Sequence, residues 1–376
     1  MKNELISMFQ KTFSGEPQVV VKAPGRINVV GEHVDYHLGF VLPAAIDQAI
    51  YLAISAQSEG PTKFYSVDHD DWYVEGAKDN PGWSGYIRTV IDIAKEQDLH
   101  ITALHCAIAA DLPVGAGLSS SAALCCGLIF GLDEMFGWNL DLVEMAEFGQ
   151  AVEHRLGIHC GLMDEYAVLH GRKDHVIKLD CGSNTHSYVS AQFDSYELVL
   201  LHSGVSHALV ESAYNDRRRV SEAGLQRIRE QFPQVKSYRD VKPDMVARTH
   251  TLSEEQVRLA QYIISEIGRV QEASLCLDGG DFDRLGQLLL ETHRGLQTQY
   301  LVTCQETDFL VDALVEYDEV LGARQMGGGF GGCILILVEK EARDRIIQQV
   351  QQDYRAKTKL QSRLIPVILG DGVCLV

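Results

Sequence analysis

Four residues with strong hydrogen-bonding side chains lie close together near the start of the chain. Residues 25–43 read GRINVVGEHVDYHLGFVLP and contain Arg26, Glu32, His33 and Asp35 between apolar stretches. Two carboxylates and an imidazole within four residues can hold several hydroxyl groups through charge-assisted hydrogen bonds. Because convergent polar groups beside apolar segments are typical of binding sites, the run indicates a site for a polyhydroxylated ligand.

Two simpler interpretations fit the same residues. The run could be a polar turn that ends at Gly39, with no ligand at all. Alternatively, His33 and His37 are four residues apart, a spacing at which two histidines on a helix can bind zinc. The remaining motifs of the chain have to decide between these possibilities.

A second motif lies between a predicted strand at 103–110 and a predicted apolar helix at 120–136. Residues 115–121 read GAGLSSS. Free backbone N–H groups and the positive end of the helix dipole would form an anion cradle there. No Gly-Lys-Ser/Thr sequence follows, so this is not a Walker A loop. The alternative is a tight turn in which Ser119 caps the helix.

The third and fourth motifs are also rich in glycine. In residues 157–166, GIHCGLMDEY, Asp164 follows a glycine turn in an apolar stretch, and it is a candidate base for a hydroxyl nucleophile. The competing and more common role would be to cap a helix at 165–170. Residues 327–332 read GGGFGG, which predicts a backbone that turns closely against a ligand or another loop, rather than a linker.

The elements that must position these motifs alternate along the chain. Strands are expected at 19–21, 50–55, 63–67, 103–110, 176–180 and 333–338, and helices at 83–97, 120–136, 141–154 and 285–296. Asp141 with Glu144, and Ser253 with Gln256, have the spacing of capping boxes that begin helices. This mixed order predicts an α+β fold, with a domain boundary near residue 180.

The composition narrows the class of protein. The chain of 376 residues is 46% hydrophobic, enough for two or three domains, and its formal charge of −19 argues against a general nucleic-acid or membrane surface. The basic cluster at 217–219 is expected to be a solvated helix face. Nine scattered cysteines without a C-x-x-C pair, and no long apolar segment, indicate a soluble cytoplasmic protein.

Together, three of the motifs resemble those of a known family. GRINVVGEHVDY, LPVGAGLSSSAA and GARQMGGGFGGC, in this order, are similar to the three motifs of the GHMP small-molecule kinases. The first motif resembles galactokinases, as do CGLMDEY, ESAYNDRRR and LLLETHRGLQTQYLVTCQETDFL, so the resemblance covers nearly the whole chain.

The resemblance implies a fold and a reaction. The fold would have a ribosomal-protein-S5-like N-terminal domain (1–180) and a ferredoxin-like C-terminal domain (181–376) with the glycine-rich loop 327–332, and the active site would lie between them. The reaction would be transfer of the γ-phosphoryl group of ATP, with Mg²⁺, to the anomeric hydroxyl of α-D-galactose. Galactose and ATP would be the partners of a monomer, without nucleic acid or membrane.

Residue roles follow by motif. The resemblance implies that Asp164 is the base, that Arg26 orients it and stabilises charge, and that Trp83 and Tyr86 flank the adenine. It implies that the sugar loop (32–36) and two later positions bind the sugar through Glu32, His33, Asp35, Gly161 and Tyr214. It implies that Ser121 and Glu153 bind Mg²⁺, and that the phosphate loop (115–121) wraps the phosphates through Gly115, Ala116, Gly117, Leu118, Ser119, Ser120 and Ser121.

The chain departs from the family pattern at a few places. His37 stands where asparagine is usual, Glu165 where glutamine is usual and Ser206 where a basic residue is common, and the segment 153–164 is one residue shorter. The alternatives are a related sugar-1-kinase acting on N-acetylgalactosamine, arabinose or galacturonate, or a non-catalytic galactose sensor. Such sensors lack a Ser-Ala pair in the phosphate loop, which this chain keeps at Ser121 and Ala122.

Overall fold

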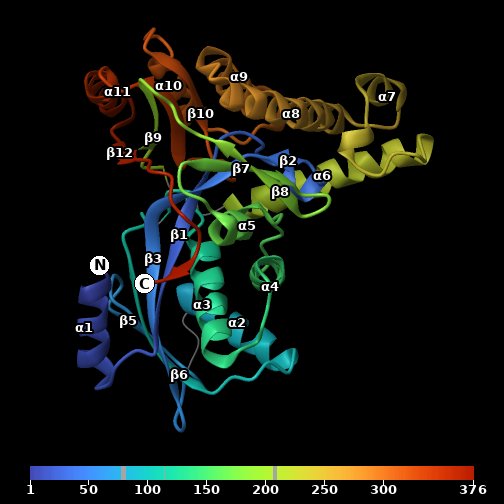
Figure 1. Ribbon diagram of the computed structural model, residues 1–376. Helices are drawn as coiled ribbons and strands as arrows, with labels where there is room; N and C mark the ends of the chain where they lie inside the picture. Colours follow the sequence, from blue (N-terminus) through green and yellow to red (C-terminus); the bar gives the residue numbers. More distant parts are fainter. Residues whose placement is uncertain (78–81, 114, 206–209) are drawn as a thin grey trace.

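Three β-sheets organise the molecule, which Figure 1 shows as a computed structural model that describes residues 1–77, 82–113, 115–205 and 210–376. The strand orders are β13-β1-β3-β6-β4-β5, β10-β11-β9-β12 and β2-β7-β8. Helices pack on the sheets rather than alternating with parallel strands, which confirms the predicted α+β class.

The strands are β1 (Val19–Asn28), β2 (Phe40–Val41), β3 (Pro43–Gln57), β4 (Lys63–Ser66), β5 (Asp71–Val74), β6 (Ala103–Ala110), β7 (His175–Asp180), β8 (Thr185–Ser190), β9 (Tyr196–His202), β10 (Val320–Gln325), β11 (Cys333–Glu339), β12 (Arg363–Pro366) and β13 (Cys374–Leu375). The longer helices are α1 (Lys2–Phe13), α2 (Trp83–Glu96), α3 (Ser120–Phe136), α4 (Leu142–Arg155), α5 (Met163–His170), α6 (Val210–Gln231), α7 (Pro243–Arg248), α8 (Glu254–Gly279), α9 (Phe282–Gly295), α10 (Gln305–Leu314) and α11 (Arg343–Thr358). Single turns of helix are η1 (Asp35–His37), η2 (Tyr238–Asp240) and η3 (Leu296–Tyr300).

The six-stranded sheet has helices on both faces. Helices α2 to α5 lie on one face, and α1 lies alone on the other (Figure 1). The amphipathic α1 buries Leu5 and Phe9 in a small separate core against the sheet. By contrast, α3 is apolar around most of its circumference, and it is buried between the sheet and the neighbouring helices.

Two glycines bring α3 unusually close to the sheet. A Cβ atom at Gly127 would lie 2.7 Å from the Cβ of Ala23, and one at Gly131 would lie 2.7 Å from Cδ1 of Ile54. Since these glycines are four residues apart, they lie on the same side of the helix. The close packing fixes the beginning of α3 at the edge of the site described below.

The four-stranded sheet forms the centre of the C-terminal part. Strands β9 and β11 are antiparallel, and their apolar side chains form a second core with α10 and α11. The apolar run predicted at 333–338 is thus the central strand β11, which has neighbours on both edges. Helices α8 and α9 extend from this sheet toward α6 and α7 (Figure 1).

The end of the chain returns to the beginning. Strand β13 pairs with β1, so that Leu375 lies opposite Val21 in the six-stranded sheet. Strand β7 ends at Asp180 and pairs with β8, so strands from both sides of the predicted boundary lie in one sheet. The division into domains 1–180 and 181–376 stays a prediction. In the described ranges, no helix has both the length and the apolar character needed to cross a membrane.

Most of the predicted local elements are confirmed. Strand β6 and helix α3 have the predicted bounds, and both capping boxes, at Asp141 and at Ser253, form as expected. Helix α9 begins at Phe282, three residues before the predicted start, because Asp281 accepts a hydrogen bond from the backbone of Arg284 and caps it.

The prediction of a solvated basic face at 217–219 is wrong for two of its three arginines. Arg217 forms an ion pair with Glu255. Arg218 donates to the carbonyl of His159 at 2.6 Å, and its guanidinium lies over the ring of Tyr36. Only the side chain of Arg219 is largely exposed, at 73%.

Candidate active site

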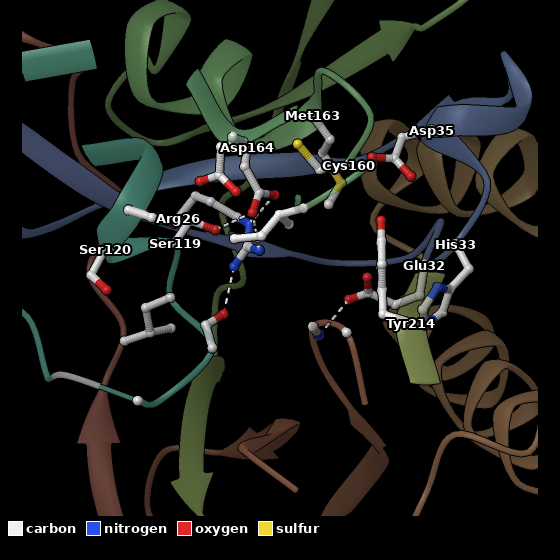
Figure 2. A pocket seen from close by; sticks show the side chains of 18 of the residues that line it. Arg26, Glu32, His33, Asp35, Ser119, Ser120, Cys160, Met163, Asp164 and Tyr214 are labelled. Carbon is white, nitrogen blue, oxygen red and sulfur yellow. Dashed lines mark hydrogen bonds and ion pairs between the residues drawn. The ribbon is translucent and has the colours of Figure 1, made fainter. Parts of the chain in front are cut away.

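A cavity of about 350 Å³ lies where the motifs meet, and it is open to solvent on one side. Figure 2 shows Arg26, Asp164 and Ser119 on one side of this cavity, and Glu32, His33, Asp35 and Tyr214 on the other. The cavity is lined by Arg26, Glu32, His33, Asp35, Tyr86, Gly115, Gly117, Leu118, Ser119, Ser120, Ser121, Glu153, Ile158, Cys160, Met163, Asp164, Tyr214, Gly327 and Gly328.

A two-pronged ion pair lies on the phosphate-loop side of the cavity. Nε and Nη2 of Arg26 donate to the two carboxylate oxygens of Asp164 at 2.7 and 2.6 Å, and Nη1 donates to the carbonyl of Gly117 at 2.6 Å. Burial alone would lower the pKa of Arg26, but the carboxylate of Asp164 outweighs it and the pKa is raised. Arg26 therefore stays charged, and it links Asp164 to the phosphate loop.

The helix-capping interpretations of Asp164 and Ser119 are wrong for the side chains. Helix α5 has Leu162 at its N-cap, and Asp164 lies within its first turn. Ser119 occupies the N-cap position of α3, but its side chain caps no backbone N–H group. Instead its hydroxyl donates to Oδ2 of Asp164. Both side chains therefore serve the cavity and not the helix ends.

Glu32 is held from the C-terminal part of the chain. Its Oε1 accepts hydrogen bonds from Nη2 of Arg324 at 3.0 Å and from the backbone N–H of Gly327 at 2.9 Å. The side chain of Arg324 is fully buried and also donates to the carbonyl of Val29. Arg324 was not among the predicted site residues, although a charged residue in a buried strand beside a glycine run is a usable signal.

The two histidines have different partners. Nδ1 of His33 lies 2.9 Å from the hydroxyl of Tyr36, and its ring stacks on Tyr300. Nε2 of His37 lies 2.9 Å from Oγ of Ser221. Burial, together with nearby arginines, lowers the pKa of each imidazole to about 3, so both are neutral. This arrangement argues against a zinc site.

Asp35 and Gly161 are in close contact. Burial, followed by the negative charge of Asp164, raises the pKa of Asp35 to about 7. A Cβ atom at Gly161 would collide with the carboxylate of Asp35, so only glycine fits there. Gly161 lies behind Asp35, in a smaller neighbouring cavity, and is not among the residues that line the main one. Tyr214 from α6 lines the main cavity, and its role in binding the sugar stays a prediction.

The phosphate loop opens the cavity toward a second one. Gly115 and Gly117 have φ angles of 74° and 72°, which favour glycine, whereas Ala116 is buried and is not among the lining residues. Ser120 and Ser121 line both the main cavity and a neighbouring, more apolar cavity of about 660 Å³.

Both predicted aromatic residues line the second cavity. Tyr86 faces both cavities, whereas Trp83 faces only the second, where its Nε1 donates to Asp71 at 3.2 Å. The second cavity also contains apolar side chains from the sheet and from α3, among them Ile108 and Leu124. A flat apolar group could enter it while a charged group on the same molecule faced the phosphate loop.

Two residues at the main cavity have oxygen donors for a divalent cation. Ser121, which has a hydroxyl, and Glu153, which has a carboxylate and is 6% exposed, both line this cavity. Oxygen ligands of this kind suit Mg²⁺, which commonly takes its remaining ligands from water and substrate phosphates. No cluster of three or more His, Cys, Asp or Glu residues suited to a metal occurs in the described part of the chain. The residues therefore fit an ion that is shared with a phosphate-bearing substrate.

Two of the departures from the family pattern lie away from the cavity, whereas the shorter segment 153–164 contributes Glu153, Cys160 and Asp164 to its lining. His37 and Glu165 are buried and are not among the lining residues. Burial, followed by the charges of Glu153 and Asp164, raises the pKa of Glu165, which favours its neutral form. Ser206 lies outside the described residues.

Comparisons with known proteins agree with this geometry. Residues 7–56 match the galactokinase galactose-binding signature, and residues 85–172 and 272–356 match the GHMP kinase N-terminal and C-terminal domains. A galactokinase of Thermotoga maritima is 36% identical over 358 residues, which cover 94% of this chain and 99% of that protein. A galactokinase of a Roseiflexus species is 32% identical, over 98% of this chain and 96% of that protein.

Solved structures give the same result. The chain resembles Lactococcus lactis galactokinase complexed with galactose, with a TM-score of 0.94 and 27% identity over the whole of both chains. A mevalonate kinase, at a TM-score of 0.66 and 16% identity over 94% of this chain and all of that one, shares the fold. From its motifs, its cavity and these relatives, we conclude that the chain belongs to the galactokinase family of the GHMP kinases.

Proposed function

We propose that this protein is a galactokinase, which transfers the γ-phosphoryl group of ATP to the anomeric hydroxyl of α-D-galactose with Mg²⁺. The observation that carries the proposal is the Arg26–Asp164 ion pair, which lies beside the phosphate loop in a cavity that the sugar loop also lines. Phosphoryl transfer depends mainly on positioning and charge stabilisation, and this arrangement supplies both.

Asp164 is proposed as the base that accepts the proton of the C1 hydroxyl. Its carboxylate is held by Arg26 and Ser119, so its orientation does not depend on the substrate. Arg26 carries a permanent positive charge that can balance the charge developing on the transferred group. Helix α5 thus supplies the base and strand β1 supplies the stabilising charge at the same place in the cavity.

The sugar hydroxyls would be bound by Glu32, His33, Asp35 and Tyr214, with Gly161 giving Asp35 the space it needs. The site offers both hydrogen-bond donors and acceptors, because Glu32 accepts hydrogen bonds and the hydroxyl of Tyr214 can donate and accept. A neutral His33 can also do either, according to its tautomer. Such a mixed set suits a ligand whose hydroxyl groups each donate and accept.

ATP would lie across the two cavities, with its adenine beside Trp83 and Tyr86 and its phosphates at the phosphate loop. The beginning of α3 supplies backbone N–H groups and a positive dipole end for the phosphates. Ser121 and Glu153 would hold Mg²⁺, which when bound neutralises charge on the phosphate oxygens.

Charge and cysteine content extend the proposal to the location and the partners of the protein. The charge of −19 supports a protein that acts on small molecules rather than on nucleic acid or an anionic membrane surface. All nine cysteines are free thiols, which supports a reducing, cytoplasmic location. We propose that the protein acts there as a monomer.

The test is an ATP-consumption assay with Mg²⁺ and a panel of galactose, glucose, N-acetylgalactosamine, arabinose and galacturonate. We expect turnover on galactose, with product phosphorylated at C1, and much lower kcat/KM values for the other sugars. If the protein turned over only another sugar of the panel, that sugar would replace galactose as the proposed substrate. Galactose binding without turnover on any of the sugars would overturn the enzymatic function in favour of a sensor.

A further inference from the structure

We propose that helix α8 positions the sugar loop through two buried side chains, Glu266 and Tyr262, which hold the backbone on either side of the Gly31–Glu32 peptide. This inference rests on the proposed function, since it concerns the affinity for galactose. Neither residue lines the main cavity, so both act through the loop and are positioning residues.

Glu266 holds the residue just before the sugar loop. Its Oε1 accepts a hydrogen bond from the backbone N–H of Gly31 at 2.7 Å, and its side chain is 0% exposed. Its Oε2 accepts from Oγ1 of Thr292 at 2.9 Å and from Nε of Arg269 at 2.7 Å. A buried carboxylate with hydrogen-bond donors on both oxygens, one of them a charged guanidinium, has one fixed orientation, and so has the N–H group that it binds.

Tyr262 holds the first residue of the loop itself. Its hydroxyl donates to the carbonyl of Glu32 at 3.0 Å, and its side chain is fully buried. Tyr262 and Glu266 are four residues apart on α8, so they project from the same side of the helix. The loop therefore receives one acceptor and one donor from a single rigid element.

The contact between the helix and the loop leaves little space for adjustment. Gly31 has a φ angle of 107°, and a Cβ atom there would lie 3.0 Å from Cγ2 of Val270 on α8 and 2.9 Å from Cα of Val41. Tyr300 continues the contact, because its ring lies 4.8 Å from Tyr262 and 4.7 Å from His33. The directions of Glu32 and His33 into the cavity thus depend on α8.

The first test compares two tyrosines that make the same kind of bond. Tyr262→Phe removes the hydrogen bond to Glu32, whereas Tyr354→Phe removes an equivalent bond from a fully buried tyrosine to the carbonyl of Ser203. Loss of one neutral hydrogen bond corresponds to roughly a 3- to 10-fold effect. We expect Tyr262→Phe to raise the KM for galactose by about this factor, with kcat and the KM for ATP nearly unchanged.

The second test uses the threonine that orients Glu266. Thr292→Val removes the hydroxyl but keeps the shape, and Thr292→Ser keeps the donor. We expect the valine variant to raise the KM for galactose roughly 10-fold, since loss of a bond to a charged group has a larger effect than loss of a neutral one, and the serine variant to stay close to the wild type.

The outcomes separate this inference from the proposed function. If the wild-type protein does not phosphorylate galactose, the proposed function fails before any variant is compared. If it does, equal losses of thermal stability in Tyr262→Phe and Tyr354→Phe, with the galactose KM raised only in the former, would support the positioning role. An unchanged galactose KM in both Tyr262→Phe and Thr292→Val, or the same KM change in Tyr354→Phe, would overturn it.

Discussion

At the scale of single residues, the site is prepared before any substrate arrives. Asp164 is bound by Arg26 through both of its oxygens and by the hydroxyl of Ser119. Groups that are already oriented need no reorganisation during the reaction, which is a main source of rate enhancement in phosphoryl transfer. The role proposed for Asp164 is therefore one of position as much as of basicity.

Replacing Asp164 should separate catalysis from binding. In Asp164→Asn the amide cannot accept the proton of the sugar hydroxyl, so kcat should fall by about 10³-fold or more, while the KM for galactose changes little. Steady-state kinetics with galactose and ATP would measure both constants.

Glu165 provides the matched control for that variant. It is the next residue, burial raises the pKa of its carboxyl and so favours the neutral form, and it does not line the main cavity. Glu165→Gln should keep kcat within about 3-fold of the wild type, because the amide has nearly the shape of the neutral acid. Comparable kcat losses in both variants would contradict the assignment of the base to Asp164.

His37 should make stability depend on pH. Burial, followed by Arg218 and His33, lowers its pKa from 6.5 to about 3 in the folded protein. As the pH falls through the window from 6.5 toward about 3, the imidazole of His37 takes up a proton in the unfolded chain but not in the folded protein, so stability is lost. His37→Asn should reduce the slope of unfolding free energy against pH by about 1.4 kcal/mol per pH unit in the middle of the window.

Urea denaturation of wild type and His37→Asn between pH 4 and pH 8 would test this expectation. The comparison relies on the slope, so any constant loss of stability from the missing bond to Ser221 cancels. Parallel curves for the two proteins across the acidic range would exclude a buried neutral His37.

At the scale of elements, the position of the phosphate loop depends on how closely the following helix, α3, packs on the sheet. Gly127→Ala in α3 would bring a methyl group within 2.7 Å of Ala23 and 2.8 Å of Leu52. Overpacking of this kind costs about 1–3 kcal/mol, so the variant should unfold at a lower temperature. Calorimetry would measure the change.

Gly268→Ala is the control, because this exposed position in α8 has no atom within 4 Å of an added Cβ. Alanine is the better helix former, so this variant should gain about 0.5–1 kcal/mol of stability. If both alanine variants shifted the melting temperature in the same direction, the close packing of α3 on the sheet would not be the cause.

Elements with a strong local signal could be predicted from the sequence, and their partners could not. Asp141 with Glu144 and Ser253 with Gln256 carry their capping signals within four residues, so α4 and α8 began where expected. The contact of Tyr262 with Glu32 joins residues 230 positions apart, and no local pattern encodes it. The same holds for Arg324, which meets Glu32 only in the folded chain.

The site itself divides in the same way. The motif resemblance predicted one site for Arg26, Asp164, Ser119 and Glu32, and in the structure these four residues line one cavity. What it did not provide is the layer behind these side chains, where Gly161 makes room for Asp35. That layer depends on packing, which is decided by the whole fold rather than by spacing along the chain.

At the scale of the whole molecule, the last residues hold the first half together. The backbone N–H groups of Gly372, Val373 and Val376 donate to the carbonyls of Gly171, Val168 and Val20 at 2.8, 2.8 and 2.9 Å. These bonds join the C-terminal segment to α5, to the residue that follows it and to β1, close to the elements that carry Arg26 and Asp164.

Deletion of residues 372–376 should therefore destabilise the protein. Loss of these hydrogen bonds and of the β13 ladder corresponds to about 2–5 kcal/mol, measurable as a lower midpoint of urea denaturation. Ile368→Ala is the control, because that side chain is 55% exposed and its loss should change the stability by less than about 0.5 kcal/mol. A truncated protein as stable as this variant would show that β13 is dispensable.

The pairing of β13 with β1 also determines when the molecule can be completed during its synthesis. The ribosome makes Val21 long before Leu375, yet the two lie opposite each other in one sheet. Until β13 emerges, this edge of β1 is unpaired, and an unpaired edge is the kind of surface that recruits strands from other chains. The nascent N-terminal half is therefore most exposed to aggregation while the C-terminal half is still being translated, and chaperone binding should concentrate in that interval.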